Sequence, residues 1–162
     1  ISAIVGSREI MKGAADSFIS STFWTERIGY AAGLAALSKM ENTQSWKIVT
    51  ETGKGIKDFW KKTFQSNQLE AEISGLDAMP SFSLSRFNPL ISKTYISQEM
   101  LKHGFLASNS VYVSVAHSEE ILGAYKEKFN DVIGKLSGVE SDSELLTHLD
   151  GPVAHSSFSR LN

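Results

Sequence analysis

The chain has 162 residues, of which 41% are hydrophobic and 21% charged, so it can bury a real core and is not expected to be disordered. Its 16 basic and 18 acidic residues give a net charge of -2 and are mixed along the sequence, which argues against a nucleic-acid partner. Cysteine is absent, which excludes disulfides, thiolate nucleophiles and zinc–cysteine sites and suits a reducing compartment, so we expect a cytoplasmic location.

The chain begins on a strand-like apolar run, residues 1–5, that stops at Gly6. It has no initiator methionine and no signal-peptide pattern, and no apolar run reaches the roughly 20 residues of a membrane span. We therefore expect no membrane association, and we expect this chain to be cut from a longer protein.

A brief helix is predicted after Ser7, through residue 11. The next stretch has no clean period and is crowded with hydroxyl groups, which favours a loop. A second helix is expected from about Arg27, with an alanine-rich face, a break at residues 42–43 and a continuation to about residue 64.

The period then changes from helical to alternating, which predicts two strands near residues 69–73 and 82–84. Residues 85–93 are expected to form a loop, residues 95–103 a helix that ends at Gly104, and residues 111–117 a β-branched strand. Ser118 is a strong helix-start signal because two acidic residues follow it. A last short helix is expected at residues 141–149, and residues 151–162 form a polar tail. This order indicates a small α+β unit.

Most catalytic motifs are absent. Residues 53–55, Gly-Lys-Gly, lack the upstream glycine of a phosphate-binding loop and lie in a helical pattern. There is no GxSxG elbow for a hydrolase. No metal site is predicted, because four histidines have no metal-ligand spacing and are expected at surfaces or helix caps: His103, His117, His148 and His155.

Residues 20–27, SSTFWTER, precede a helix and are rich in hydroxyl groups. Free amides at a helix N-terminus, with hydroxyl groups beside them, favour binding of a phosphate dianion. The alternative is simple capping, in which Thr25 and Glu26 satisfy the first turn of the helix. The pattern alone leaves both interpretations open and favours capping.

Four segments together resemble class III pyridoxal-phosphate (PLP) aminotransferases, and most closely the branch that includes glutamate-1-semialdehyde 2,1-aminomutase. They are SAIVGSREIM, SSTFWTERIGYAAGLAAL, VYVSVAHSEEI and GPVAHSSFSRLN, in that order. The resemblance covers essentially the whole chain. It implies an α/β fold, the C-terminal part of a fold-type-I PLP-dependent transferase. Residues 1–42 would end the large PLP-binding domain, residues 43–66 would form a connecting helix, and residues 67–162 a small C-terminal α+β domain.

The resemblance also assigns cofactor contacts. The family's Schiff-base lysine lies upstream of the position of Ile1, so no catalytic residue is expected in this chain. Thr22 stands nine residues before Ala31, where the family has a threonine that reaches the cofactor phosphate of the neighbouring subunit. Thr22, with Ser21 beside it, is therefore the expected cofactor-binding position. This implies PLP as cofactor and a homodimer with shared active sites.

The chain departs from the family at two places. Residues 25–27 are Thr-Glu-Arg, where the family commonly has a small residue, Asn or His, and Pro, which puts the loop's substrate contacts in doubt. Residues 111–120 contain no arginine to hold a substrate carboxylate. We infer an unusual amino donor or acceptor.

The implied function is part of a PLP-dependent aminotransferase or aminomutase that acts on a small-molecule amino donor and acceptor. We expect the chain to be inactive alone. The alternative is a non-catalytic α+β binding or assembly domain derived from the same scaffold.

Overall fold

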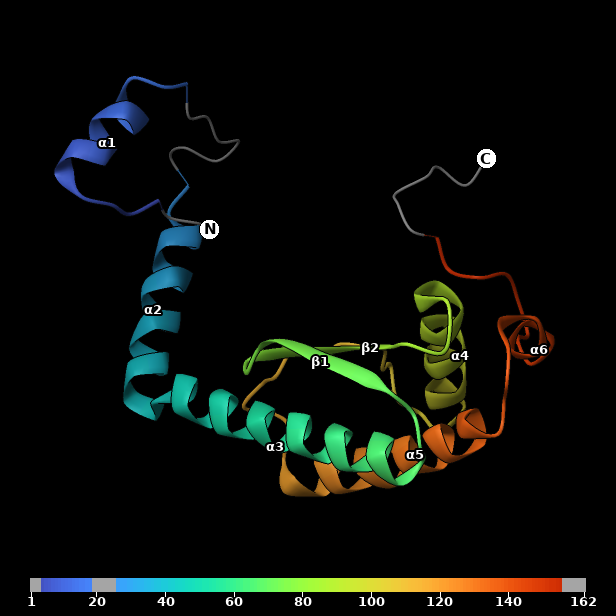
Figure 1. Ribbon diagram of the computed structural model, residues 1–162. Coiled ribbons are helices and arrows are strands. Elements are labelled where there is room, and N and C mark those ends of the chain that lie inside the picture. Colours follow the sequence, from blue (N-terminus) through green and yellow to red (C-terminus); the bar gives the residue numbers. More distant parts are fainter. Residues whose placement is uncertain (1–3, 19–25, 156–162) are drawn as a thin grey trace. The chain divides into compact units, whose positions relative to one another are not determined.

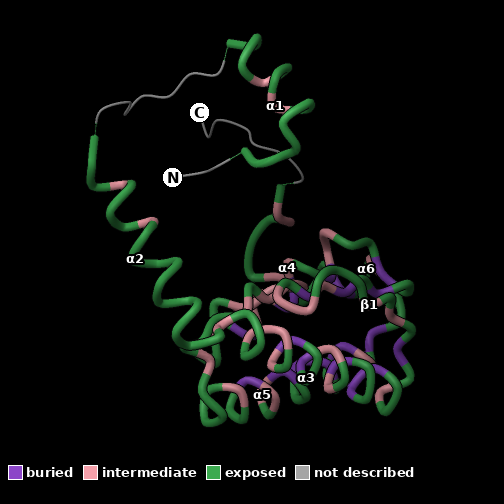
Figure 2. The backbone as a smooth tube through the Cα atoms, turned by 90° about the vertical axis from the view of Figure 1, so that its left-hand side faces the viewer, coloured by how far each residue is buried: buried purple, intermediate pink, exposed green. Residues whose placement is uncertain are grey.

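The computed structural model describes residues 4–18 and 26–155, in two compact units, Ile1–Ser45 and Trp46–Asn162 (Figure 1). Buried residues gather in the second unit (Figure 2). Among the described residues, no helix combines the length and apolar character that a membrane span requires.

The first unit contains helices α1 (Arg8–Ala15) and α2 (Ile28–Thr43). Ser7 is the N-cap of α1, as predicted, although its side chain makes no capping hydrogen bond. The strand predicted at residues 1–5 is wrong at residues 4 and 5, which are exposed and irregular. A strand needs a hydrogen-bonded neighbour, and the described part of this unit offers none. Residues 1–3 lie outside the described part.

Helix α2 is apolar but has no buried residue. It carries no charge from residue 28 to residue 38, and Leu34 is 68% exposed. The predicted break is confirmed: Thr43 is the last residue of α2, and Gln44 follows in the left-handed conformation with φ of 51°. Such a residue commonly ends a helix by satisfying its last carbonyl groups.

The second unit places a β-hairpin across two long helices. Helix α3 (Ser45–Ser66) precedes the antiparallel strands β1 (Ala71–Leu76) and β2 (Met79–Leu84), and helices α4 (Pro89–Lys102), α5 (Glu119–Ser137) and α6 (Asp142–Thr147) come after them. Figure 1 shows the hairpin over α3 and α5, with α4 and α6 beside it. The two predicted strands are confirmed.

Aromatic side chains hold this unit together. Phe129 of α5 lies 5.8 Å, between ring centroids, from Phe82 of β2, and Phe82 lies 4.8 Å from Trp60 of α3. All three side chains are at most 2% exposed. Each buried ring contributes about 1.5–3 kcal/mol by leaving water, so this cluster fixes the hairpin on the helices.

The segment predicted as a strand at residues 111–117 is only partly one. Residues 109–113 run antiparallel to β2 and make three backbone hydrogen bonds to it or to its preceding turn, but they are extended chain with a single isolated bridge at Ser110. The Val111 N–H donates to the carbonyl of Pro80 at 3.0 Å. The reciprocal bond cannot form, because proline has no N–H. Pro80 thus interrupts the ladder.

The prediction of a loop at residues 85–93 is wrong from residue 89. Helix α4 begins at Pro89, and its N-cap Asn88 accepts a hydrogen bond from the Leu90 N–H at 2.9 Å. Proline suits the first helical position because its missing N–H would be unpaired there anyway. The predicted end of this helix is confirmed, since Gly104 has φ of 84° and its N–H donates to Leu101.

The helix starts predicted after Ser118 and Ser141 are confirmed. The Ser118 hydroxyl accepts from the Ile121 N–H at 3.3 Å, and the Ser141 hydroxyl accepts from the Glu144 N–H at 3.2 Å. Each cap satisfies an amide that has no partner within the helix. Helix α5 then buries one face, as its spacing predicts, with Tyr125 and Phe129 among its buried residues.

Candidate functional site

The predicted cofactor contacts Thr22 and Ser21 lie outside the described residues. The next described element of the chain is α2, whose N-cap position is occupied by Arg27. The Arg27 side chain makes no capping hydrogen bond. The backbone carbonyl of Arg27 accepts a hydrogen bond from the Ala31 N–H at 2.9 Å. Because the first amides of a helix lack intrahelical partners, this end of α2 suits an anion.

Two lysines of the described part, Lys54 and Lys102, have surroundings that oppose Schiff-base chemistry. Lys54 lies 2.8 Å from a carboxylate oxygen of Glu51, and Lys102 lies 2.7 Å from one of Glu99. The hydrogen bonds to these carboxylates raise the pKa of both lysines. A lysine that attacks a carbonyl needs the opposite shift, toward the neutral amine. These two lysines are therefore poor candidates for Schiff-base chemistry, and the position of the Schiff-base lysine upstream of Ile1 stays a prediction.

Residues 53–55 do not form a phosphate-binding loop, as expected from the sequence. They lie inside α3, where Gly53 is buried and Gly55 exposed. A methyl group placed on Gly53 would overlap the backbone carbonyl oxygen of Asp77, in the turn between β1 and β2. The glycine therefore permits close contact between helix and hairpin.

The histidines have structural positions. His103 and His148 are the C-caps of α4 and α6, as predicted for cap residues. His117 lies in the loop before α5, and its Nδ1 accepts from the Ser114 N–H at 3.3 Å. His155 is exposed. Over residues 4–18 and 26–155, no three or more histidine, aspartate or glutamate side chains gather as a metal site would require.

Arg86, close to the hairpin, is also occupied structurally. Its guanidinium donates to the carbonyls of Ser137 at 3.0 Å, Val139 at 3.3 Å and Gln68 at 3.3 Å. These bonds tie the end of β2 to the end of α5. A guanidinium used in this way is not free to hold a substrate carboxylate by a two-pronged contact.

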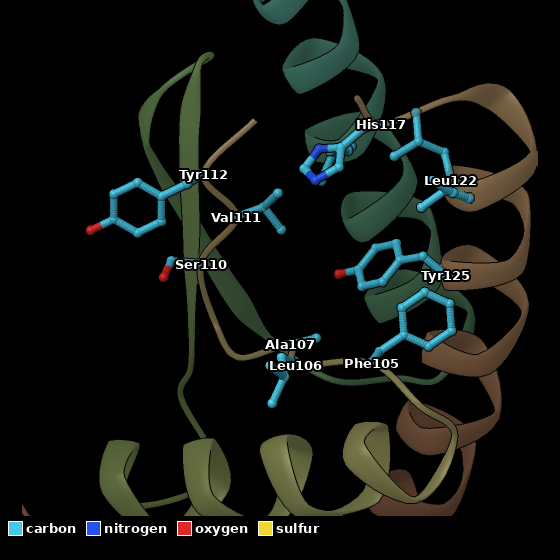
Figure 3. A pocket seen from close by; sticks show the side chains of 11 residues that line it. Phe105, Leu106, Ala107, Ser110, Val111, Tyr112, His117, Leu122 and Tyr125 are labelled. Carbon is cyan, nitrogen blue, oxygen red and sulfur yellow. The ribbon is translucent and has the colours of Figure 1, made fainter. Parts of the chain in front are cut away.

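A pocket of about 280 Å³ opens between α3, α5 and residues 105–117 (Figure 3). At its base lies Tyr125, which is 6% exposed and accepts a hydrogen bond from the Trp60 indole N–H at 2.9 Å. Burial raises the pKa of Tyr125, so the phenol stays protonated. His117 lies above it, and Phe105, Val111 and Leu122 are among the apolar walls. No sequence pattern signals this pocket, because its lining combines Ile56 of α3 with residues between 105 and 125, which lie far from α3 in the chain.

Comparison with known proteins finds relatives in sequence and in structure, while no family model matches the chain. In sequence, it is similar to 2'-deamino-2'-hydroxyneamine transaminase of Streptomyces kanamyceticus, with 23% identity over 141 residues, which are 84% of this chain and 35% of that protein. In structure, it is similar to the FumI protein of Sphingopyxis sp. MTA144 in its PLP internal aldimine form, with a TM-score of 0.70 and 18% identity over 87% of this chain and 36% of that one. The chain thus spans about a third of the length of each relative.

These similarities confirm the predicted fold class, an α/β chain with the fold of part of a fold-type-I PLP-dependent transferase. They also confirm the resemblance to PLP-dependent aminotransferases that the sequence segments indicated. The finer assignment, to class III and its aminomutase branch, stays a prediction.

Proposed function

We propose that this chain is part of a PLP-dependent aminotransferase or aminomutase that acts on a small-molecule amino donor and acceptor. The observation that carries the proposal is the similarity to a transaminase over 84% of the chain. The structural similarity to a PLP enzyme over 87% of the chain supports it independently. Class III membership, a cytoplasmic location and the domain division at residues 42 and 66 belong to the same proposal.

In this proposal, Thr22 and Ser21 bind the phosphate of PLP together with the first amides of α2. The observation that supports this binding is the N-terminus of α2, where the side chain of the N-cap residue Arg27 makes no capping hydrogen bond. A dianion is stabilised there by N–H groups and by the positive end of the helix dipole. When bound, PLP supplies an electron sink for cleavage of a bond at the amino-bearing carbon. The lysine that holds it lies upstream of Ile1.

The proposal is tested by comparing two proteins. We expect the protein expressed from its complete reading frame to purify with PLP, with a visible absorbance band that an amino donor removes and an amino acceptor restores. The 162-residue chain alone should keep no visible band after dialysis, because its lysines lack a buried pocket that favours the neutral amine. A complete protein that binds no PLP would instead support the non-catalytic binding or assembly domain.

The proposed homodimer makes a separate prediction. If Thr22 serves the neighbouring subunit's cofactor, a subunit without the Schiff-base lysine and a subunit disabled at Thr22 should together form one intact site. Activity should reappear on mixing the two inactive variants. Differently tagged subunits that co-purify without regaining activity would show that Thr22 acts within its own subunit or not at all.

A further inference from the structure

We propose that the pocket between α3, α5 and residues 105–117 binds a small neutral carbonyl compound with an aromatic or branched aliphatic body, anchored by the Tyr125 hydroxyl. The pocket lies wholly within the unit Trp46–Asn162. The inference therefore does not rest on the proposed transaminase function.

The first observation is an unused hydrogen-bond donor. The Tyr125 oxygen accepts from Trp60 at 2.9 Å, which leaves its own O–H proton free to donate. Among the described residues, none accepts that proton in a side-chain hydrogen bond. In Figure 3 the hydroxyl points from α5 toward the pocket and the segment that carries Val111 and Ala107. A buried donor without an acceptor is costly, so an acceptor in the pocket would stabilise this arrangement.

His117 supplies a second donor on the same pocket. Its Nδ1 accepts from the Ser114 N–H, so in the neutral imidazole the proton resides on Nε2. The ring lines the pocket above Tyr125 (Figure 3). A carbonyl oxygen has two lone pairs and can accept from more than one donor. The polar part of the ligand is therefore an acceptor and not a donor.

The walls set the charge and size of the ligand. No lysine, arginine, aspartate or glutamate is among the lining residues of this described pocket. With the His117 imidazole neutral, a carboxylate would enter without a cationic partner, and burying an unpaired charge is costly. A volume of about 280 Å³ exceeds the 150 Å³ or so of an engineered cavity that holds benzene. It therefore suits a single ring with a short carbonyl substituent.

The experiment compares three probes of similar size by titration of the full chain, followed by amide chemical shifts of the pocket residues. Acetophenone carries the acceptor, ethylbenzene lacks it, and benzoate adds a charge. We expect acetophenone to bind roughly two- to tenfold more tightly than ethylbenzene, the range for one net hydrogen bond, and benzoate to bind more weakly than acetophenone. Shifts should centre on residues 105–112 and 117–125.

Tyr125→Phe should reduce the preference for acetophenone over ethylbenzene, with the His117 donor still present, while both probes still bind. Because this change leaves the Trp60 N–H unpaired, the double variant Trp60→Phe/Tyr125→Phe, which removes both partners, serves as the second test. It should show the same reduction in preference. Ala107→Leu, which fills part of the pocket, should weaken both probes equally.

Several outcomes would overturn the proposal. They are equal binding of acetophenone and ethylbenzene to the unchanged chain, a preference that is undiminished in both Tyr125 variants, and tighter binding of benzoate. Absence of binding by all three probes would do so too. So would loss of binding as the protein concentration rises, because that would show that the pocket mouth, where Leu106 and Tyr112 are exposed, contacts another protein chain. The presence or absence of PLP in the complete protein changes none of these results.

Discussion

Thr22→Ala in the complete protein is expected to weaken PLP binding roughly ten- to a hundredfold. The physical reason is that a hydrogen bond to a charged group contributes about 1.5–3 kcal/mol, and each 1.4 kcal/mol or so corresponds to a factor of ten in affinity. The measurement is the dissociation constant of PLP, from titration of the cofactor-free protein followed by absorbance.

Two control variants separate the hydroxyl from the fold. Thr22→Ser keeps a hydroxyl group and should retain most of the affinity. Ser21→Ala should cost less than Thr22→Ala, because Ser21 is only the neighbour of the matched threonine. In the cofactor-free state, all three proteins should have the same thermal unfolding midpoint, because bound PLP would itself raise it. If Thr22→Ala and the unchanged protein bind PLP with equal affinity, Thr22 does not contact the cofactor. The transaminase proposal would then still be tested separately, by the absorbance experiment.

The elements that the sequence predicted well are those with local signals. Ser118 and Ser141 precede acidic residues and start helices, and Gly104 ends one by adopting a positive φ. The aromatic spacing of α5 correctly predicted its buried face, since that spacing directly reflects the helical period. Local chemistry was sufficient in these cases, because each signal acts within a few residues.

The elements that the sequence misjudged mostly depend on partners elsewhere in the chain. Residues 111–117 have strand propensity, yet the regular ladder fails because Pro80, on the facing strand, has no N–H to donate. The start of α4 is different, because its local signal, Asn88 followed by Pro89, suits a turn as well as a helix start. The pocket at Tyr125 depends on contacts between α3, α5 and the 105–117 segment, which no periodicity reveals.

Gly53→Ala and Gly55→Ala are expected to change the stability of the chain in opposite directions, although both glycines lie in α3. Gly55 is exposed, and a methyl group there meets nothing within 4 Å. Alanine is favoured over glycine in a helix by about 0.8–1.0 kcal/mol, so Gly55→Ala should be stabilising by about that amount. At Gly53 the same gain is outweighed, because the methyl group would overlap the Asp77 carbonyl oxygen.

The turn cannot easily move away from Gly53, because Lys57 holds it. The Lys57 ammonium donates to the Gly75 carbonyl at 2.7 Å and to a carboxylate oxygen of Asp77 at 2.9 Å. Overpacking typically costs about 1–3 kcal/mol, and overlap with backbone places this site at the upper end. After the helix gain is subtracted, Gly53→Ala should lower the free energy of unfolding by about 2 kcal/mol. Urea unfolding followed by circular dichroism measures both variants.

A double-mutant cycle with Lys57→Met tests the reason for this loss. Without the ammonium the turn is freer to shift, so Gly53→Ala should cost less in the Lys57→Met background than in the unchanged chain, whereas Gly55→Ala should give the same gain in both. Lowering the pH should likewise reduce the destabilisation caused by Gly53→Ala, because it weakens the bond between Lys57 and Asp77. The hydrogen bond from Lys57 lowers the pKa of Asp77, so its contribution to stability is present above the ordinary aspartate pKa and is lost as the pH falls through the lowered value. A cost of Gly53→Ala that is unchanged by Lys57→Met would mean that the clash is relieved within α3 and not at the turn.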